Sequence, residues 1–203
     1  MSEQRRPPEL QQAAATGAAD PGPGTHTGTG TGAGAGEQPG LAQRLEQATR
    51  AAQARRLVEA DTLLGEILAE QPDQLRALDL LGFVRFFQQR YAEAEQACRR
   101  ALVLKPDHAY ARKGLGLCLA RQGRLDEGIA ELQRAIALKP GWFDPYWDLA
   151  VVLDEGDRPQ EALRILAVGQ VAVPARRRDF LGFAARLRAV LERRQGERGE
   201  QNS

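Results

Sequence analysis

The chain has 203 residues, of which 42% are hydrophobic and 5% aromatic, and its formal net charge is +1. That length allows one or two domains, and the balanced charge excludes a globally basic protein that coats nucleic acid. No apolar run follows Arg5 and Arg6, and no stretch of about 18 apolar residues could span a bilayer. We therefore expect a soluble, cytoplasmic protein.

Residues 1–40 are rich in glycine, alanine, threonine and proline, and they predict a disordered arm. Few of them are apolar, so burial could not offset the entropy lost on ordering. Glycine occupies alternate positions from Gly28 to Gly36, which invites comparison with a phosphate-binding loop. No strand-like segment precedes this run and no Gly-Lys-Ser/Thr closes it, so we interpret it as a linker.

Beyond the arm, prolines recur at intervals of 34 residues, a spacing that indicates a repeat array. These prolines are Pro72, Pro106, Pro140 and Pro174. Small residues recur in step with them, which favours helices that pack closely. The pattern predicts four repeats of two antiparallel helices each, covering residues 41–74, 75–108, 109–142 and 143–176.

On these residues the block resembles the tetratricopeptide repeat family. The resemblance implies an all-α fold, an α-solenoid of helix-turn-helix repeats wound into a right-handed superhelix. Some positions depart from the family pattern, and they cluster in repeats one and two. They are Arg44, Gln47, Ala51, Arg85 and Gln89. The polar residues of repeat one suit a terminal helix that faces water.

Residues 177–194 predict a C-terminal capping helix, because apolar side chains stand there at helical spacing. Residues 195–203 predict a disordered tail. Several arginines, among them Arg176, Arg186 and Arg193, make this end locally basic. We interpret them as a solvated face, and the alternative is contact with nucleic acid or an acidic partner.

The resemblance further implies that the first helix of each repeat lines a concave groove that holds a peptide segment of a partner. Carried onto this chain, the family's groove positions give a candidate peptide site. Its residues are Arg76, Asp79, Phe83, Phe86, Tyr110, Lys113, Leu117, Arg121, Trp147, Asp148, Val151 and Asp154. Phe87 and Trp142 are assigned to the core instead. Relatives that grip the carboxylate of chaperone tails use asparagines and lysines, but the only asparagine here is Asn202.

No constellation of residues predicts catalysis, a metal or a cofactor. The histidines are His26 in the arm and His108 beside a turn, and Cys98 and Cys118 lack metal-ligand spacing. Nothing supplies a nucleophile with an oriented base. The sequence therefore predicts a non-enzymatic scaffold or adaptor for protein interactions, with nucleic-acid binding and self-association as the other hypotheses.

Overall fold

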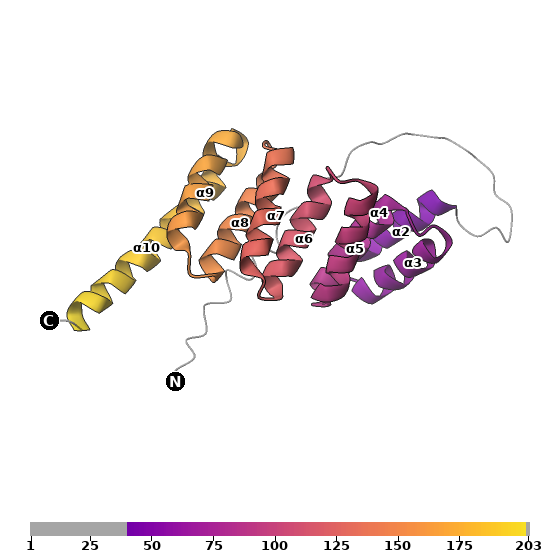
Figure 1. The fold of residues 1–203 in the computed structure, drawn as a ribbon, viewed down its shortest axis with the longest axis horizontal. Coiled ribbons are helices and arrows are strands. Elements are labelled where there is room, and N and C mark those ends of the chain that lie inside the picture. The colour runs from indigo at the N-terminus through magenta and orange to yellow at the C-terminus, as the bar shows by residue number, and fades with distance from the viewer. Residues whose placement is uncertain (1–39, 202–203) are drawn as a thin grey trace.

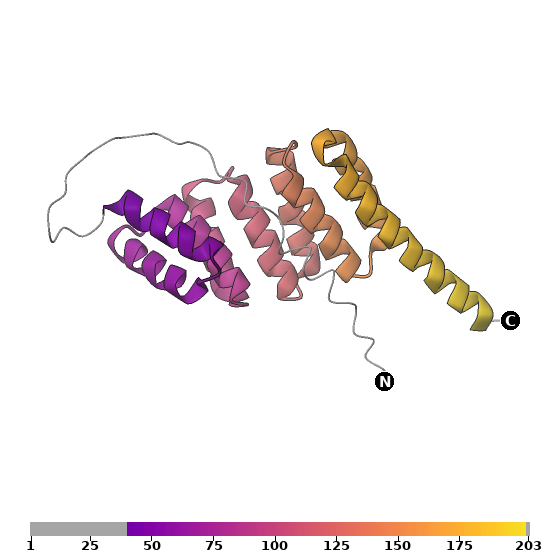
Figure 2. The same ribbon diagram turned by 180° about the vertical axis from the view of Figure 1, so that it is seen from behind.

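The computed structural model describes residues 40–201, with the side chains of residues 40–192. The predicted N-terminal arm lies outside the described residues except for Gly40, which directly precedes the first helix. Within the described range the regular structure is all helical (Figures 1 and 2). The elements are α2 (Leu41–Gln53), α3 (Leu57–Glu70), α4 (Leu75–Phe87), α5 (Tyr91–Leu104), α6 (Ala109–Arg121), α7 (Leu125–Leu138), α8 (Phe143–Glu155), α9 (Pro159–Ala172), the short 3₁₀ helix η1 (Pro174–Arg176) and α10 (Arg177–Gln201).

The helices alternate between two lengths and two roles. The first helix of each repeat, here called an A helix, has 13 residues (α2, α4, α6, α8). The second, a B helix, has 14 residues (α3, α5, α7, α9). Each A helix packs on the B helix that follows, and each B helix packs on the next A helix. The described residues thus form the all-α solenoid that the sequence predicts.

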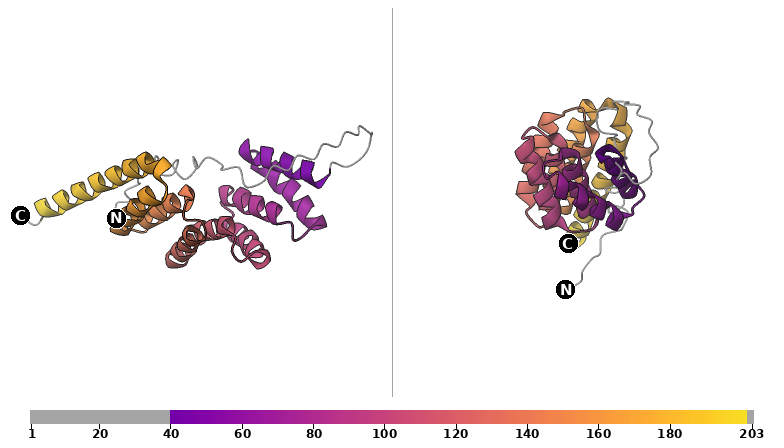
Figure 3. Two further views of the ribbon diagram at one scale, coloured as in Figure 1. Left: turned by 90° about the horizontal axis from the view of Figure 1, so that it is seen from above. Right: turned by 90° about the vertical axis from the view of Figure 1, so that its right-hand side faces the viewer.

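The array is curved, and the left panel of Figure 3 shows it as an arc with α2 and α3 at one end and α10 at the other. Consecutive A helices also contact one another, from α2 to α4, α4 to α6 and α6 to α8. Helices on the inside of a curve must lie closer together than those on the outside. We therefore call the solvent-facing surface of the A helices the inner face.

The helices of repeat three approach so closely that their backbones touch. A Cβ atom placed on Gly116 of α6 would lie 2.8 Å from the carbonyl oxygen of Gly128 on α7. One placed on Gly128 would lie 2.6 Å from the carbonyl oxygen of Gly116. No side chain fits at either position without moving a helix, which explains why glycine stands at both.

The turn between the A and B helices of each repeat contains one residue in the left-handed region of backbone conformation. These residues stand 34 apart, and their φ values are 59° at Arg55, 63° at Gln89, 80° at Gly123 and 58° at Asp157. Only one of them is glycine, although a side chain disfavours this conformation. Gln89, which departs from the family pattern, thus occupies the turn position with the usual geometry.

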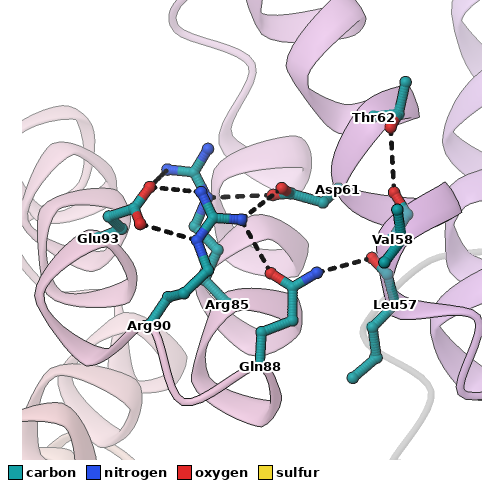
Figure 4. A network of polar contacts seen from close by, with 8 residues as sticks. All are labelled: Leu57, Val58, Asp61, Thr62, Arg85, Gln88, Arg90 and Glu93. Atoms are coloured by element: carbon teal, nitrogen blue, oxygen red, sulfur yellow. Dashed lines mark hydrogen bonds and ion pairs between the residues drawn. The ribbon is translucent and has the colours of Figure 1, made fainter.

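An arginine before α5 clamps that helix to the previous repeat (Figure 4). Arg90 donates to Glu93 of its own helix at 2.7 Å and to Asp61 of α3 at 2.6 Å. Arg85 also donates to Asp61, at 3.1 Å, and Gln88 donates to the backbone of α3 at 3.2 Å. Arg85, the other departure in repeat two, is therefore an inter-repeat contact.

The same clamp recurs in the next two repeats, where the arginine again pairs with the glutamate three residues on and with a carboxylate of the preceding B helix. The pairs are Arg124 with Glu127 (2.6 Å) and Glu95 (2.9 Å), and Arg158 with Glu161 (2.6 Å) and Asp126 (2.7 Å). Partly exposed ion pairs contribute little stability, so the clamps act mainly by fixing how one repeat sits on the next.

The C-terminal helix α10 covers the last repeat and then continues past it (Figure 1). Phe180 and Phe183 are buried against α8 and α9, and the Phe180 ring occupies the space that a Cβ on Gly169 would need. The helix extends to Gln201, whereas the sequence predicts its end at 194 and a disordered tail from 195. Gly196 and Gly199 are residues of the kind that often end a helix, but α10 continues through both.

Replacing Gly116 by alanine should lower the free energy of unfolding by about 1–3 kcal/mol, because the added methyl group forces α6 and α7 apart. Urea unfolding followed by circular dichroism measures the change. Gly65→Ala is the matched control, since a Cβ at Gly65 on α3 meets nothing within 4 Å. That variant should gain up to about 1 kcal/mol from helix propensity. Equal effects of both substitutions would contradict the close approach.

Candidate functional site

The predicted groove residues differ in how far they are exposed to solvent. Arg76, Tyr110 and Arg121 are exposed. Those half-buried are Asp79, Phe83, Phe86, Lys113, Leu117, Trp147 and Asp154. Asp148 and Val151 are buried, with 8% and 5% of their surface exposed. Most of the predicted set is thus open to solvent at least in part, and these two residues are not.

Val151 and Trp147 lie where α10 packs against α8. Val151 belongs to the same apolar cluster as Phe180 and Phe183 of α10. The Trp147 ring lies 4.9 Å from the Phe183 ring and 5.5 Å from the Phe143 ring, measured between centroids. The predicted groove position of Val151 is therefore filled by the core, because the capping helix covers this part of α8.

Three phenylalanine rings near the end of α4 lie close together in the N-terminal half of the array. The Phe87 ring lies 4.6 Å from Phe83 and 5.7 Å from Phe86, and the Arg55 guanidinium stands 4.2 Å from its centre. All three phenylalanines are half-buried, so Phe87, which was assigned to the core, is partly accessible too. Trp142, the other residue assigned to the core, is buried with 9% exposed.

Lys113 of α6 is the centre of a charged group between repeats three and four. Its Nζ lies 3.6 Å from Asp144 Oδ2 and 3.6 Å from Asp148 Oδ2, both on α8. It also stands 5.7 Å from the ring centre of Tyr110 and 5.2 Å from that of Trp142. Both carboxylate distances exceed the length of a normal charge-assisted hydrogen bond, so Lys113 neutralises these carboxylates only loosely.

A hydrogen-bonded pair adjoins this group through Tyr110. His108 Nε2 lies 2.7 Å from Asp79 Oδ2, and the His108 ring is 6.3 Å from the Tyr110 ring. Tyr110 stacks on Trp142 at 6.2 Å with an angle of 18° between the planes. The connected set spans α4 to α8, and we call it the Lys113 cluster. Its members are Asp79, His108, Tyr110, Lys113, Trp142, Asp144 and Asp148.

Buried polar atoms without a hydrogen-bond partner concentrate here. In the part of the chain that the structure describes, they are Asp79 Oδ1, Trp142 Nε1, Trp147 Nε1 and Asp148 Oδ2. All but the Trp147 atom belong to the Lys113 cluster. Buried polar groups in proteins are normally paired, so unpaired ones in one place call for an explanation.

The ionisation of Asp148 reflects this environment. Burial raises its pKa to about 6, and the like charge of Asp144 adds to the effect, while Lys113 and Arg121 oppose it. Burial lowers the pKa of Lys113, but Asp148 and Asp144 together outweigh it, and the net shift is upward. Lys113 is therefore charged at neutral pH, whereas ionisation of the buried Asp148 carboxyl costs free energy.

Other candidate chemistry is not found in the described residues. No group of three or more histidine, cysteine or acidic residues there could hold a metal ion. Cys98 and Cys118 are free and buried, and the hydrogen bond to Cys118 together with burial raises the pKa of the Cys98 thiol. Within the same range, every helix is too short or too polar to cross a membrane.

Asp148→Asn should stabilise the protein at neutral pH. The pKa of Asp148 is raised from 3.8 to about 6 on folding, so ionisation costs free energy, and the cost grows between those values and stays constant above them. The amide, which mimics the protonated acid, should raise the free energy of unfolding by about 1–3 kcal/mol at neutral pH. Urea unfolding at several pH values tests this: a gain that persists at about pH 4 would contradict the assigned cause.

Residues 81–142 match the family model described as Tetratricopeptide repeat. A search of curated protein sequences gives no significant match. Among solved structures, an O-GlcNAc transferase mutant from Thermobaculum terrenum is 25% identical with a TM-score of 0.60, over 64% of this chain and 25% of the transferase. The chain thus spans about a quarter of the length of that enzyme.

Two further structures share the fold. MamA from Desulfovibrio magneticus RS-1 is 20% identical with a TM-score of 0.59, over 64% of this chain and 73% of MamA. The first TPR of Spaghetti (RPAP3), solved bound to the HSP90 peptide SRMEEVD, is 17% identical with a TM-score of 0.53, over 57% of this chain and 92% of that one. The family match, these neighbours and the 34-residue helical frame agree. Residues 81–142 therefore match the tetratricopeptide repeat family, and the described helices have the solenoid fold of such repeats.

Proposed function

We propose that this chain is a non-enzymatic adaptor that binds an extended segment of a partner protein along its inner face. The observation that carries the proposal is the set of buried polar atoms in the Lys113 cluster that have no hydrogen-bond partner among the described residues: Asp79 Oδ1, Trp142 Nε1 and Asp148 Oδ2. Each such atom costs roughly 1–3 kcal/mol while it lacks a partner. A bound segment whose entry rearranges the cluster would supply the missing donors and acceptors, which makes binding at this place favourable.

Apolar anchors lie on the A helices on the N-terminal side of the Lys113 cluster and beside it. Phe83 and Phe86 of α4 and Leu117 of α6 are half-buried, so each presents a fixed apolar surface to an incoming side chain. Binding free energy at protein interfaces is concentrated in a few such anchors, while charged groups set the register. Apolar side chains on α4 and α6 and charged side chains on α6 and α8 would together provide both features.

The structural neighbours support a peptide as the class of ligand. The first TPR of Spaghetti (RPAP3) was solved with a bound peptide of HSP90, whose printed sequence, SRMEEVD, is rich in acidic residues. The inner face here carries Asp79, Asp144 and Asp148 instead of the asparagine-rich clamp that grips chaperone tails. We therefore infer a partner segment of different chemistry.

The alternative, binding of nucleic acid or an acidic partner by the basic end of the chain, has weaker support. Arg176 is paired with Asp179 at 2.6 Å and covers the Phe143 ring at 4.0 Å. Arg186 lies 5.9 Å from the centre of the Phe183 ring. Part of this positive charge is thus engaged within the fold, where it helps α10 to pack.

Selection of a random-peptide display library on the full chain tests the proposed site, with affinities of selected peptides measured by fluorescence polarisation. Tyr110→Ala should weaken binding by about tenfold or more, because Tyr110 is an exposed ring beside Lys113. Gln133→Ala, on the exposed surface of α7, is the control and should leave affinity unchanged. Peptides that bind both variants as well as they bind the unaltered protein would show that the inner face is not the site.

A further inference from the structure

Two carboxylates of the Lys113 cluster share one ammonium group. One ammonium group, that of Lys113, faces two carboxylates, those of Asp144 and Asp148, each at 3.6 Å. Asp79 on the neighbouring A helix pairs with His108, and Arg121 also acts on the charge of Asp148. An incoming carboxylate would be repelled by both Asp144 and Asp148, whereas a guanidinium could donate hydrogen bonds to them.

The carboxylate of Asp148 is also poorly satisfied as a hydrogen-bond acceptor. Asp148 is 8% exposed, its Oδ2 has no hydrogen-bond partner, and this atom faces Lys113 across 3.6 Å. Elsewhere in the same array, arginine–carboxylate pairs such as Arg90 with Asp61 close to 2.6 Å. The fold is thus able to build tight charge pairs, but it leaves this one loose.

The aromatic side chains beside these carboxylates present their faces to cations. Lys113 and Lys139 both stand near the Trp142 ring, with Nζ 5.2 Å and 5.3 Å from its centre. Tyr110, stacked on Trp142, is 36% exposed, so its ring reaches solvent next to the acidic pair. A guanidinium is planar, stacks on aromatic faces and donates two parallel hydrogen bonds to a carboxylate, so it fits this arrangement better than an ammonium.

We propose that the Lys113 cluster is a specificity site for an arginine side chain carried by an extended segment of another protein. The inference rests on the proposed function and specifies the chemistry of its ligand. In the free protein, Lys113 occupies the position that the partner's arginine would take. Its flexible side chain moves aside when the guanidinium of that arginine donates hydrogen bonds to Asp148 and Asp144. Because Asp144 and Asp148 are acidic, the site prefers a basic segment. It disfavours acidic chain ends of the kind in the HSP90 peptide.

The test uses three synthetic peptides that share apolar flanking residues and differ only at one central position, which is arginine, citrulline or glutamate. Citrulline keeps the shape of arginine and removes its charge. Binding to the full chain is followed by tryptophan fluorescence, because Trp142 and Trp147 are the only tryptophans and both lie at or beside the site. The arginine peptide should bind about tenfold or more tighter than the citrulline peptide, and the glutamate peptide should bind weakest.

Substitutions locate the effect. Asp148→Asn should remove most of the preference for arginine over citrulline, even though this variant is expected to be more stable than the unaltered protein. Loss of the preference therefore cannot be ascribed to unfolding. Asp73→Asn, on the exposed turn before α4, is the matched control and should keep the preference.

Equal affinity for the arginine and citrulline peptides, or a preference for glutamate, overturns the inference. If display-selected peptides bind at Tyr110 but carry no essential arginine, the proposed function stands and this inference fails. If no selected peptide depends on Tyr110, the proposed function itself fails. The double variant Arg5→Ala, Arg6→Ala should bind the arginine peptide unchanged. A gain in affinity of about tenfold would show that Arg5 and Arg6 occupy the site in the unaltered protein. It would contradict the inference that the site binds a separate partner.

Discussion

The architecture depends on how closely the two helices of a repeat approach each other. At Gly116 and Gly128 the backbones of α6 and α7 are in direct contact, and a single methyl group on either would clash. Such close hairpins stack, and contacts between consecutive A helices then place these helices on the inside of the curve. The inner face, and every polar group that it carries, follows from this packing.

Oppositely charged side chains lie closer together at the turns of the array than they do around Lys113. At the turns, Arg90 and its equivalents close to within 2.9 Å of carboxylates on two helices, which fixes each repeat on its neighbour. Lys113, in contrast, remains 3.6 Å from both of its carboxylates, and Asp148 Oδ2 has no hydrogen-bond partner. The loose contacts of Lys113 thus contrast with the close arginine–carboxylate pairs at the turns.

The helical frame was accessible from the sequence because prolines and small residues recur every 34 residues, and each repeat folds by local rules. The candidate site was accessible only in part. Val151 occupies the same position in its repeat as Phe83 and Leu117, but its burial depends on α10, which follows only the last repeat. The arginine clamps were missed although their signal, arginine followed by glutamate three residues on, recurs in step with the repeats.

The direct test of the inner face as binding surface is the NMR signal of the indole N–H group of Trp142 during titration with the arginine peptide. This group is buried without a hydrogen-bond partner and lies against Tyr110 and Lys113, so an occupant of the site must change its surroundings. The structure predicts a shift of this resonance that saturates with peptide. An unchanged Trp142 resonance, with shifts confined to α10 or to the B helices, would contradict it.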